Sequence, residues 1–143
     1  MVSSFGKNAV VTLNVLGGPL KSCCTSPMTG WFRDGFCRTD EHDKGVHVVC
    51  AEVDDRFLQF SKSRGNDLTT PRLPGFPGLK AGDKWCLCAM RWQEAKIAGF
   101  APKVDLEATN KAVLNFTSLN LLAEEAINDW QRQQATKLVS NEP

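Results

Sequence analysis

Runs of alternating apolar and polar residues predict the strands of this chain. Residues 10–15 alternate with a period of two, are rich in β-branched side chains and end at a Gly-Gly-Pro sequence. In residues 45–53 and 84–90 both faces of the predicted strand are largely apolar, as in strands that lie inside a sheet. Residues 104–106 predict a short fourth strand.

Helical spacing of apolar residues predicts three helices. Asp54 or Asp55 can cap a helix that runs to about residue 64 and ends at Gly65, which suits the left-handed position after a helix. Residues 91–98 predict a second helix, closed by a glycine. A third opens at residue 117 or 118. Its apolar residues at helical spacing are Leu119, Leu122, Ala123, Ala126, Ile127 and Trp130.

Strands interleaved with short helices favour a single compact α+β domain, with a small sheet packed against helices in two layers. A chain of 143 residues suits one such domain. We expect residues 11–15, 46–51 and 85–90 to share one sheet, covered by the helices. We assign residues 1–13 to an N-terminal extension that includes the start of the first strand, 14–135 to the domain and 136–143 to a frayed tail.

Two long loops connect these elements. Residues 21–44 are rich in Ser, Thr, Gly and Asp, and we expect their aromatic residues to be buried anchors. Residues 64–83 contain three prolines and are unusually long for a loop, which favours a functional role. We expect this second loop to be ordered and to form a cleft with residues 29–35. Alternatively, it is a rigid connector pinned by Leu73, Phe76 and Leu79.

Composition narrows the classes of partner. Seventeen Lys and Arg against sixteen Asp and Glu give a net charge of +1, which predicts no general attraction to nucleic acid or anionic lipid. No apolar run reaches the ~20 residues of a membrane span, so we expect no membrane partner. A small-molecule ligand is a candidate partner. Without an export signal pattern, a cytoplasmic location is expected. In that reducing compartment the cysteines would be thiols or metal ligands rather than disulfides.

Motifs of dinucleotide, phosphate-loop and serine-hydrolase sites are missing from the sequence. The unusual feature is sulfur, with six cysteines and two histidines. Cys86 and Cys88 would project from one face of a strand, where they can share zinc. His47 and Cys50 would face opposite sides of a regular strand unless a bulge intervenes. The tentative metal ligands are Cys86, Cys88, Cys23 and Cys37. The alternative is that the cysteines are small core residues.

Polar residues of the two loops are candidates for ligand binding. They are Arg33 and Asp34 in the first loop and Arg64, Asn66 and Asp67 in the second. Each group also fits ordinary turn chemistry, because glycines stand beside them. His42, among acidic residues, fits a solvated loop. If the protein is an enzyme with a cysteine nucleophile, Cys50 or Cys37 assisted by His47 is the candidate pair.

Several sequence stretches together resemble a known family. They are NVLGGPL (14–20), PMTGWFRDGFC (27–37), HVVCA (47–51), FSKSRGNDL (60–68), FPGLKAGDKWCLCAMRW (76–92) and LEATN (106–110). The family that they resemble is domain of unknown function 2237, small bacterial and plant-type proteins. The resemblance implies a compact two-layer α+β fold and no assigned reaction, substrate or cofactor. Phe36 and Asn110 depart from the family pattern, which argues against a mechanism that needs a thiol or an imidazole there.

The sequence therefore predicts an uncharacterised small protein with one candidate site. That site binds a small ligand or a metal and is built from loops 21–44 and 64–83 with the nearby cysteines. Two alternatives stay open: an enzyme with a cysteine nucleophile assisted by histidine, and a protein-interaction module with structural thiols.

Overall fold

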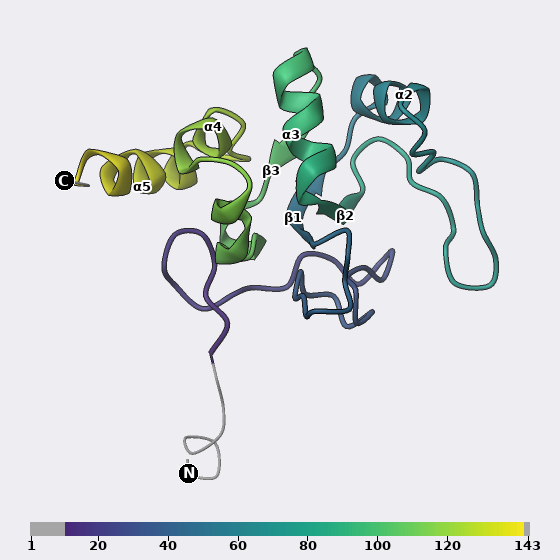
Figure 1. Ribbon diagram of the computed structural model, residues 1–143, viewed down its shortest axis with the longest axis horizontal. Helices are drawn as coiled ribbons and strands as arrows, with labels where there is room; N and C mark the ends of the chain where they lie inside the picture. The colour runs from purple at the N-terminus through teal and green to yellow at the C-terminus, as the bar shows by residue number, and fades with distance from the viewer. Residues whose placement is uncertain (1–10, 142–143) are drawn as a thin grey trace, which may run out of the picture.

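A computed structural model describes residues 11–141 of the chain (Figure 1). Its sheet has three antiparallel strands in the order β2-β1-β3. The strands are β1 (His47–Glu52), β2 (Lys84–Cys88) and β3 (Lys103–Val104). The strands predicted at residues 45–53, 84–90 and 104–106 therefore form, and β1 is the central one. β2 is an edge strand, and residues 89–90 already belong to the following helix.

Helices flank the sheet. They are α2 (Asp55–Ser63), α3 (Ala89–Ala98), α4 (Leu119–Glu124) and α5 (Asp129–Ser140), with 3-10 turns η1 (Leu106–Ala108) and η2 (Lys111–Asn115). In Figure 1, α2 and α3 lie toward one end of the sheet, α4 and α5 lie on the side of β3, and residues 11–46 run irregularly below the sheet. The arrangement confirms a single α+β domain.

The helix predicted after Asp54 forms as expected. The side chain of Asp54 accepts a hydrogen bond from the backbone N–H of Phe57, and so caps the first turn of α2. Phe57, Leu58 and Ser61 face the core. Gly65 has φ +89°, the left-handed conformation that glycine adopts most easily. These local signals act within a few residues, which is why the sequence predicts this helix accurately.

The strand predicted at residues 10–15 does not form; residue 10 itself lies outside the described residues. Leu13 and Asn14 make single bridges to Pro19 and Asn110 and do not join the sheet. The cause is the side chain of Asn14, which accepts hydrogen bonds from the N–H groups of residues 16 and 18. It thereby folds the chain into a tight turn at Gly17 (φ +93°).

The single helix predicted from residue 118 onward is broken in two. Ser118 caps α4 as expected, but Asn128 caps a second helix, α5, through the N–H of Gln131. Between them the N–H of Ile127 donates to the carbonyl of Val104 in β3. This contact with β3 competes with the i→i−4 hydrogen bond that a continuous helix would require. Residues 136–140, assigned above to the tail, are helical, and residues 142–143 lie outside the described part.

The core lies between the sheet and its helices. Residues 48–51 of β1 are fully buried, together with Phe57 of α2, Trp92 of α3 and Leu122 of α4. The indole N–H of Trp92 donates to the carbonyl of Pro102, so that its one polar group is satisfied. Among the described residues, no helix is long and apolar enough to cross a membrane.

Candidate functional site: a cationic cleft over a sulfur cluster

Four cysteines form two disulfides, which corrects the expectation that they are thiols. Cys23 bonds to Cys50 and Cys37 bonds to Cys86. Cys50 and Cys86 stand opposite each other on β1 and β2. Their partners both lie in loop 21–44, so the two bonds fasten this loop to the sheet. Neither local propensity nor apolar spacing carries information on which cysteines pair.

The sulfur atoms form a separate buried cluster. All four bonded cysteines are buried, packed with Ala108. The Sγ atoms of Cys23, Cys37 and Cys50 all lie within 4.8 Å of one another. Cys86 joins them through its bond to Cys37. Cys88, one of the tentative metal ligands, is a half-buried free thiol, as is Cys24. The structure therefore brings Cys86 together with Cys23, Cys37 and Cys50.

Two buried threonines hold the strands at this cluster. The Thr109 hydroxyl accepts a hydrogen bond from the N–H of Cys50 at 3.1 Å, and the Thr29 hydroxyl accepts one from the N–H of Cys86 at 2.8 Å. Both threonines are fully buried. Each comes from a segment outside the sheet, so these bonds add to the strand ladder in fixing the two cysteines.

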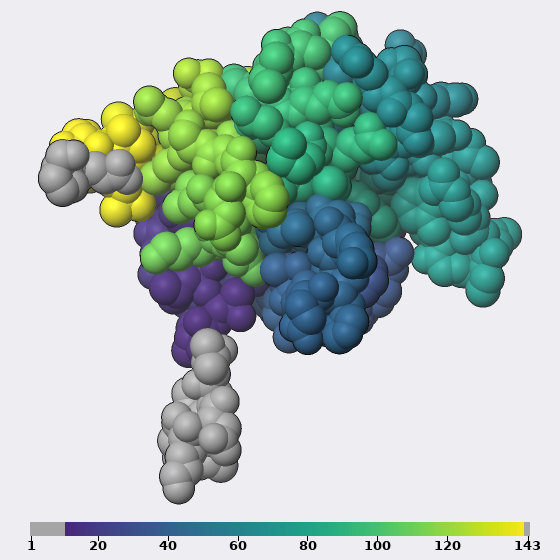
Figure 2. All heavy atoms as spheres, viewed as in Figure 1, coloured from purple at the N-terminus to yellow at the C-terminus, as the bar shows by residue number. Residues whose placement is uncertain are grey.

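A cleft of about 310 Å³ opens between loops 21–44 and 64–83. Figure 2 shows the two loops as separate lobes of the surface with an indentation between them. The expectation that the loops share a cleft is confirmed. The residues that line it are Gly30, Trp31, Arg33, His47, Leu68, Arg72, Phe76, Trp85 and Cys86.

The burial of the loop residues differs in part from expectation. Phe76 and Leu79 are buried, as predicted for residues that pin the second loop. Leu73 is 81% exposed and pins nothing. Trp31 and Phe32, expected to be buried anchors, are each 42% exposed, and Trp31 is a wall of the cleft. Their exposure removes them from the core and leaves an aromatic surface available for a ligand.

Two arginines give the cleft a positive charge. The guanidinium of Arg33 lies 5.1 Å from the ring centre of Trp85, and that of Arg72 lies 5.7 Å from the ring of Phe76. Each also donates to a backbone carbonyl of its own loop, at 2.8 and 2.7 Å. In the described part of the chain neither forms an ion pair with a carboxylate, and the lining contains no Asp or Glu. The positive charge of the cleft is therefore not neutralised by its own walls.

His47 enters the cleft from the start of β1 and is held by Asp43. Nδ1 of His47 lies 2.6 Å from Oδ1 of Asp43, whose side chain is fully buried. Burial opposes ionisation of Asp43, but hydrogen bonds from the N–H and imidazole of His47 and from the Thr39 hydroxyl lower the pKa of its carboxyl overall. An ionised Asp43 accepts a hydrogen bond from Nδ1, which leaves Nε2 as the ring nitrogen that Asp43 does not engage.

The backbone is strained on both sides of this histidine and at Arg33. Val46 has φ +49° and Arg33 has φ +55°, in the left-handed region that non-glycine residues seldom occupy. A side chain at Gly45 would approach the His47 ring to 2.5 Å, so the ring would have to shift to admit it. A bulge follows between His47 and Val49. Strain of this kind clusters at functional sites because the surrounding structure has to enforce it.

The other predicted ligand-binding residues do not line the cleft. Asp34 forms an ion pair with Arg38 at 2.6 Å. Arg64 stacks over Phe60 of α2. The hydroxyls of Thr70 and Thr69 bond to the carboxylate of Asp67 and hold its pKa well below its ordinary value. The carbonyl of Asn66 accepts from Ser61. In each case the contacts are local, as the turn interpretation expects.

Sequence reasoning missed Arg72, Trp85 and Asp43 as residues of the site. Asp43 lies in the acidic stretch interpreted as a solvated loop. That interpretation fits His42, whose side chain is 76% exposed, and fails for Asp43, which is buried. The spacing of four residues between Asp43 and His47 was the available signal, because a tight turn can bring such residues together.

We expect Asp43→Asn to lower the free energy of unfolding at neutral pH. The variant should also lose less stability than the wild type as the pH falls. The folded protein has a lowered carboxyl pKa at Asp43, so this stabilisation is complete above the ordinary value of 3.8 and is lost as pH falls through the folded value. Removing the charge costs about 1–3 kcal/mol at neutral pH. Thermal unfolding measured from neutral to acidic pH tests this, with the exposed Glu41→Gln as control. An unchanged neutral-pH stability in Asp43→Asn would contradict it.

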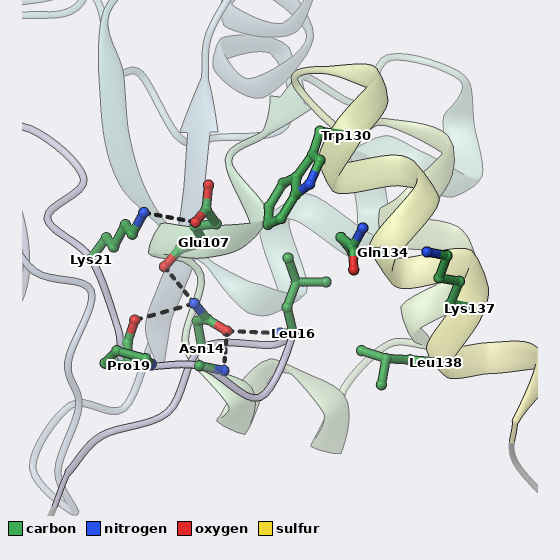
Figure 3. A pocket seen from close by; sticks show the side chains of 10 residues that line it. Asn14, Leu16, Pro19, Lys21, Glu107, Trp130, Gln134, Lys137 and Leu138 are labelled. Carbon is green, nitrogen blue, oxygen red and sulfur yellow. Dashed lines mark hydrogen bonds and ion pairs between the residues drawn. The ribbon is translucent and has the colours of Figure 1, made fainter.

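A second cavity, of about 270 Å³, lies between the first turn of the chain and α5 (Figure 3). Several of its polar groups are already paired. The carboxamide of Asn14 makes four hydrogen bonds to backbone groups, and Lys21 pairs with Glu107 at 2.8 Å. Its apolar walls are Leu16, Trp130 and Leu138. Lys137 and Gln134 also line this cavity, but none of its lining residues has a strained non-glycine backbone. The cleft beside His47, with strained backbone and two arginines, is therefore the better candidate.

The protein family described as "Uncharacterized protein conserved in bacteria (DUF2237)" matches residues 13–126 of the chain. The match includes both loops, all six cysteines and both disulfides. No curated protein matches the chain.

Proposed function

Because the chain belongs to the DUF2237 family of uncharacterized proteins conserved in bacteria, whose description names no activity, we propose a function from the cleft itself: it binds a small anionic molecule. The observation that carries this proposal is the pair Arg33 and Arg72, which line one cleft and have no carboxylate partner within residues 11–141. A ligand carboxylate or phosphate supplies the missing charge and accepts the guanidinium hydrogen bonds.

The walls of the cleft add a preference for a flat or apolar group beside the anion. Trp31, Phe76 and Trp85 contribute aromatic surface, and the ring of His47 stacks parallel to Trp31 at 6.5 Å. The volume of about 310 Å³ is at the small end of ligand sites. The arginines are already held by backbone carbonyls, which reduces the entropy lost on binding.

Arg33→Ala and Arg72→Ala are each expected to weaken binding of benzoate or phenyl phosphate about tenfold or more, because each removes a charge-assisted hydrogen bond. Trp31 and Trp85 line the cleft, so quenching of tryptophan fluorescence reports occupancy. Arg56→Ala is the matched control, since Arg56 also stacks on an aromatic ring, Phe100, but does not line the cleft. Equal binding of the cation benzylamine, or full affinity in both variants, would refute the proposal.

A second candidate function is metal binding by the reduced sulfur cluster. Three Sγ atoms already lie within 4.8 Å of one another, and Cys86 is bonded to one of them. Four thiolates around zinc stand about 3.8 Å apart, given Zn–S distances of ~2.3 Å. Reduction of the two disulfides would thus supply a tetrathiolate set with little movement of the strands.

The reduced protein is then expected to retain one zinc ion per chain, measured by metal analysis after gel filtration. Cys23→Ser should lose the metal, because three thiolates leave the coordination open. Cys88→Ser and Cys24→Ser are the matched controls, because these thiols are outside the cluster. Reduced protein that retains no zinc would refute this candidate. Loss of zinc in Cys88→Ser would show that the zinc site includes Cys88 and is not the four-cysteine cluster.

A cytoplasmic location stays a prediction, and so does the absence of nucleic-acid partners. The interaction-module alternative also stays a prediction, with the two disulfides as support for structural roles of the sulfur atoms.

A further inference from the structure

His47 lines the cleft together with the two arginines, and one of its ring nitrogens is not engaged. Nδ1 is held by the buried carboxylate of Asp43 at 2.6 Å, and 36% of the His47 side chain is exposed. Within residues 11–141 no hydrogen bond involves Nε2. Because Nδ1 is turned toward Asp43, Nε2 lies on the side of the ring that points away from this carboxylate.

A bulge in β1 turns His47 toward the cleft. In a regular strand, residues three apart face opposite sides of the sheet, so His47 would point away from the face of Cys50. The bulge that follows His47 adds one residue, so that His47 pairs with Cys88. Cys50 pairs with Cys86, which lies on the same face of β2 as Cys88. His47 therefore shares the face to which the disulfides fasten loop 21–44. Bulges of this kind re-aim side chains beside functional sites.

The carboxylate behind the ring favours a positively charged imidazole. Burial of Asp43 opposes its ionisation, but hydrogen bonds from His47 and Thr39 lower the pKa of its carboxyl overall. In the described chain, Asp43 is the one carboxylate within ion-pair distance of the His47 ring. An imidazole that donates from Nδ1 to this anion becomes a second donor, at Nε2, once it is protonated there.

The charges around the cleft match those of a dianion. Arg33, Arg72 and a protonated His47 carry three positive charges. Asp43, behind the ring, carries one negative charge, and no other residue of the described lining is charged. A dianion balances the two remaining charges, whereas a carboxylate balances only one. A phosphate monoester is mostly a dianion above its second pKa of about 6, and it has three terminal oxygens, one for each donor group.

From this arrangement we propose that the cleft binds phosphate monoesters of flat or apolar groups, with His47 as the third donor to the phosphate. The inference deepens the proposed binding of small anions and rests on it. The two guanidinium groups and Nε2 of the protonated ring each donate to a terminal oxygen. The organic group of the ester packs against the aromatic walls, Trp31 and Trp85.

Binding involves a proton and no covalent step. The proton at Nε2 comes from the solvent or, when the phosphate is a monoanion, from the phosphate hydroxyl itself. In both cases the bound state is an imidazolium beside a phosphate dianion. No bond of the ester is made or broken, so the ligand leaves unchanged.

The test compares ligands that share a ring and differ in the anion. Phenyl phosphate and phenyl sulfate have the same three terminal oxygens, but at about pH 7.5 the first is mostly a dianion and the second is a monoanion. Quenching of tryptophan fluorescence at fixed salt gives each affinity. Phenyl phosphate is expected to bind about tenfold more tightly than phenyl sulfate or benzoate, because a further charged hydrogen bond forms.

Inorganic phosphate separates the ester from the free ion. It carries a similar charge but lacks the ring, so in competition with phenyl phosphate it should bind about tenfold more weakly. Equal affinities of inorganic phosphate and phenyl phosphate would overturn the assignment to esters.

His47→Gln assigns the preference to the ring, with His42→Gln as the matched control. His42 is 76% exposed and does not line the cleft. His47→Gln should weaken phenyl phosphate about tenfold while leaving phenyl sulfate and benzoate within about twofold. A variant whose cleft is merely distorted would weaken all three ligands, as Arg33→Ala should.

Nitrogen-15 NMR of the histidine rings reads the bound state directly. The chain contains two histidines, so His42→Gln assigns the His47 signals. In the complex with phenyl phosphate, Nε2 of His47 is expected to be protonated. A bare Nε2 in that complex would show that the ring does not donate to the phosphate, and the inference would fail.

Equal affinities of the wild type for phenyl phosphate and phenyl sulfate would also overturn the inference, and this comparison does not depend on any variant folding. A preference for phenyl phosphate that survives in His47→Gln would do the same. In either case, benzoate binding that still requires Arg33 and Arg72 would leave the proposed function standing. If neither benzoate nor phenyl phosphate binds, both proposals are wrong.

Discussion

Replacing Cys37 and Cys86 together with Ala is expected to lower the free energy of unfolding by about 4 kcal/mol. The bond joins residues 49 positions apart, and closing a loop of that length restricts the unfolded chain by about this amount. It also fastens loop 21–44 to β2, so part of the loss falls on the cleft. Guanidinium denaturation under oxidising conditions with a chelator present measures it.

The same experiment on Cys23→Ala with Cys50→Ala should give a slightly smaller loss, about 3.5 kcal/mol, because these residues are 27 positions apart. Cys88→Ala is the control, since Cys88 is a free thiol that is only half-buried. If both double variants are as stable as Cys88→Ala, the two disulfides are not formed in solution. Treatment of the wild type with a reductant should then also leave its midpoint unchanged.

Trp92→Ala is expected to cost about 3–5 kcal/mol, the usual range for removing a buried tryptophan. Trp92 is fully buried in α3 and is the largest of the completely buried side chains. The variant creates a cavity beneath the sheet and also leaves the carbonyl of Pro102 without its indole donor. Chemical denaturation, followed by circular dichroism, gives the difference.

Met90→Ala provides the comparison on the same helix. Met90 is 55% exposed, so its truncation should change the free energy of unfolding by no more than about 0.5 kcal/mol. A loss of less than 1 kcal/mol in Trp92→Ala would mean that α3 does not pack as described. If both variants lose the same amount, the effect belongs to the helix itself rather than to the core.

Elements with strong local signals could be predicted from the sequence. Asp54 and Gly65 mark the start and the end of α2 by signals close to the helix itself. The apolar runs of β1 and β2 require burial, which a sheet provides. The contact between the two long loops was also predictable, because Phe76 and Leu79 needed cover. Each of these inferences used residues close together in the sequence or a simple need for burial.

Other features depend on distant contacts that a sequence pattern does not contain. Asn14 bonds to the carbonyl of Glu107, and Val104 interrupts the last helix through Ile127. The cleft could not be predicted for the same reason, because Arg33 and Arg72 line it together only when the two loops fold toward each other. Cysteine pairing is the clearest case, because four cysteines permit three connectivities and six permit fifteen.

The order of the bonded cysteines along the chain has a consequence for biosynthesis. Cys37 lies between Cys23 and Cys50, while its own partner Cys86 lies beyond both. As the chain leaves the ribosome, Cys23 and Cys37 are both present before either native partner has been made, so a bond formed between them at that stage would have to be reversed later. It follows that any fragment able to carry both native bonds must include residues 23–86, and that one ending before residue 86 would leave Cys37 available to the wrong neighbour.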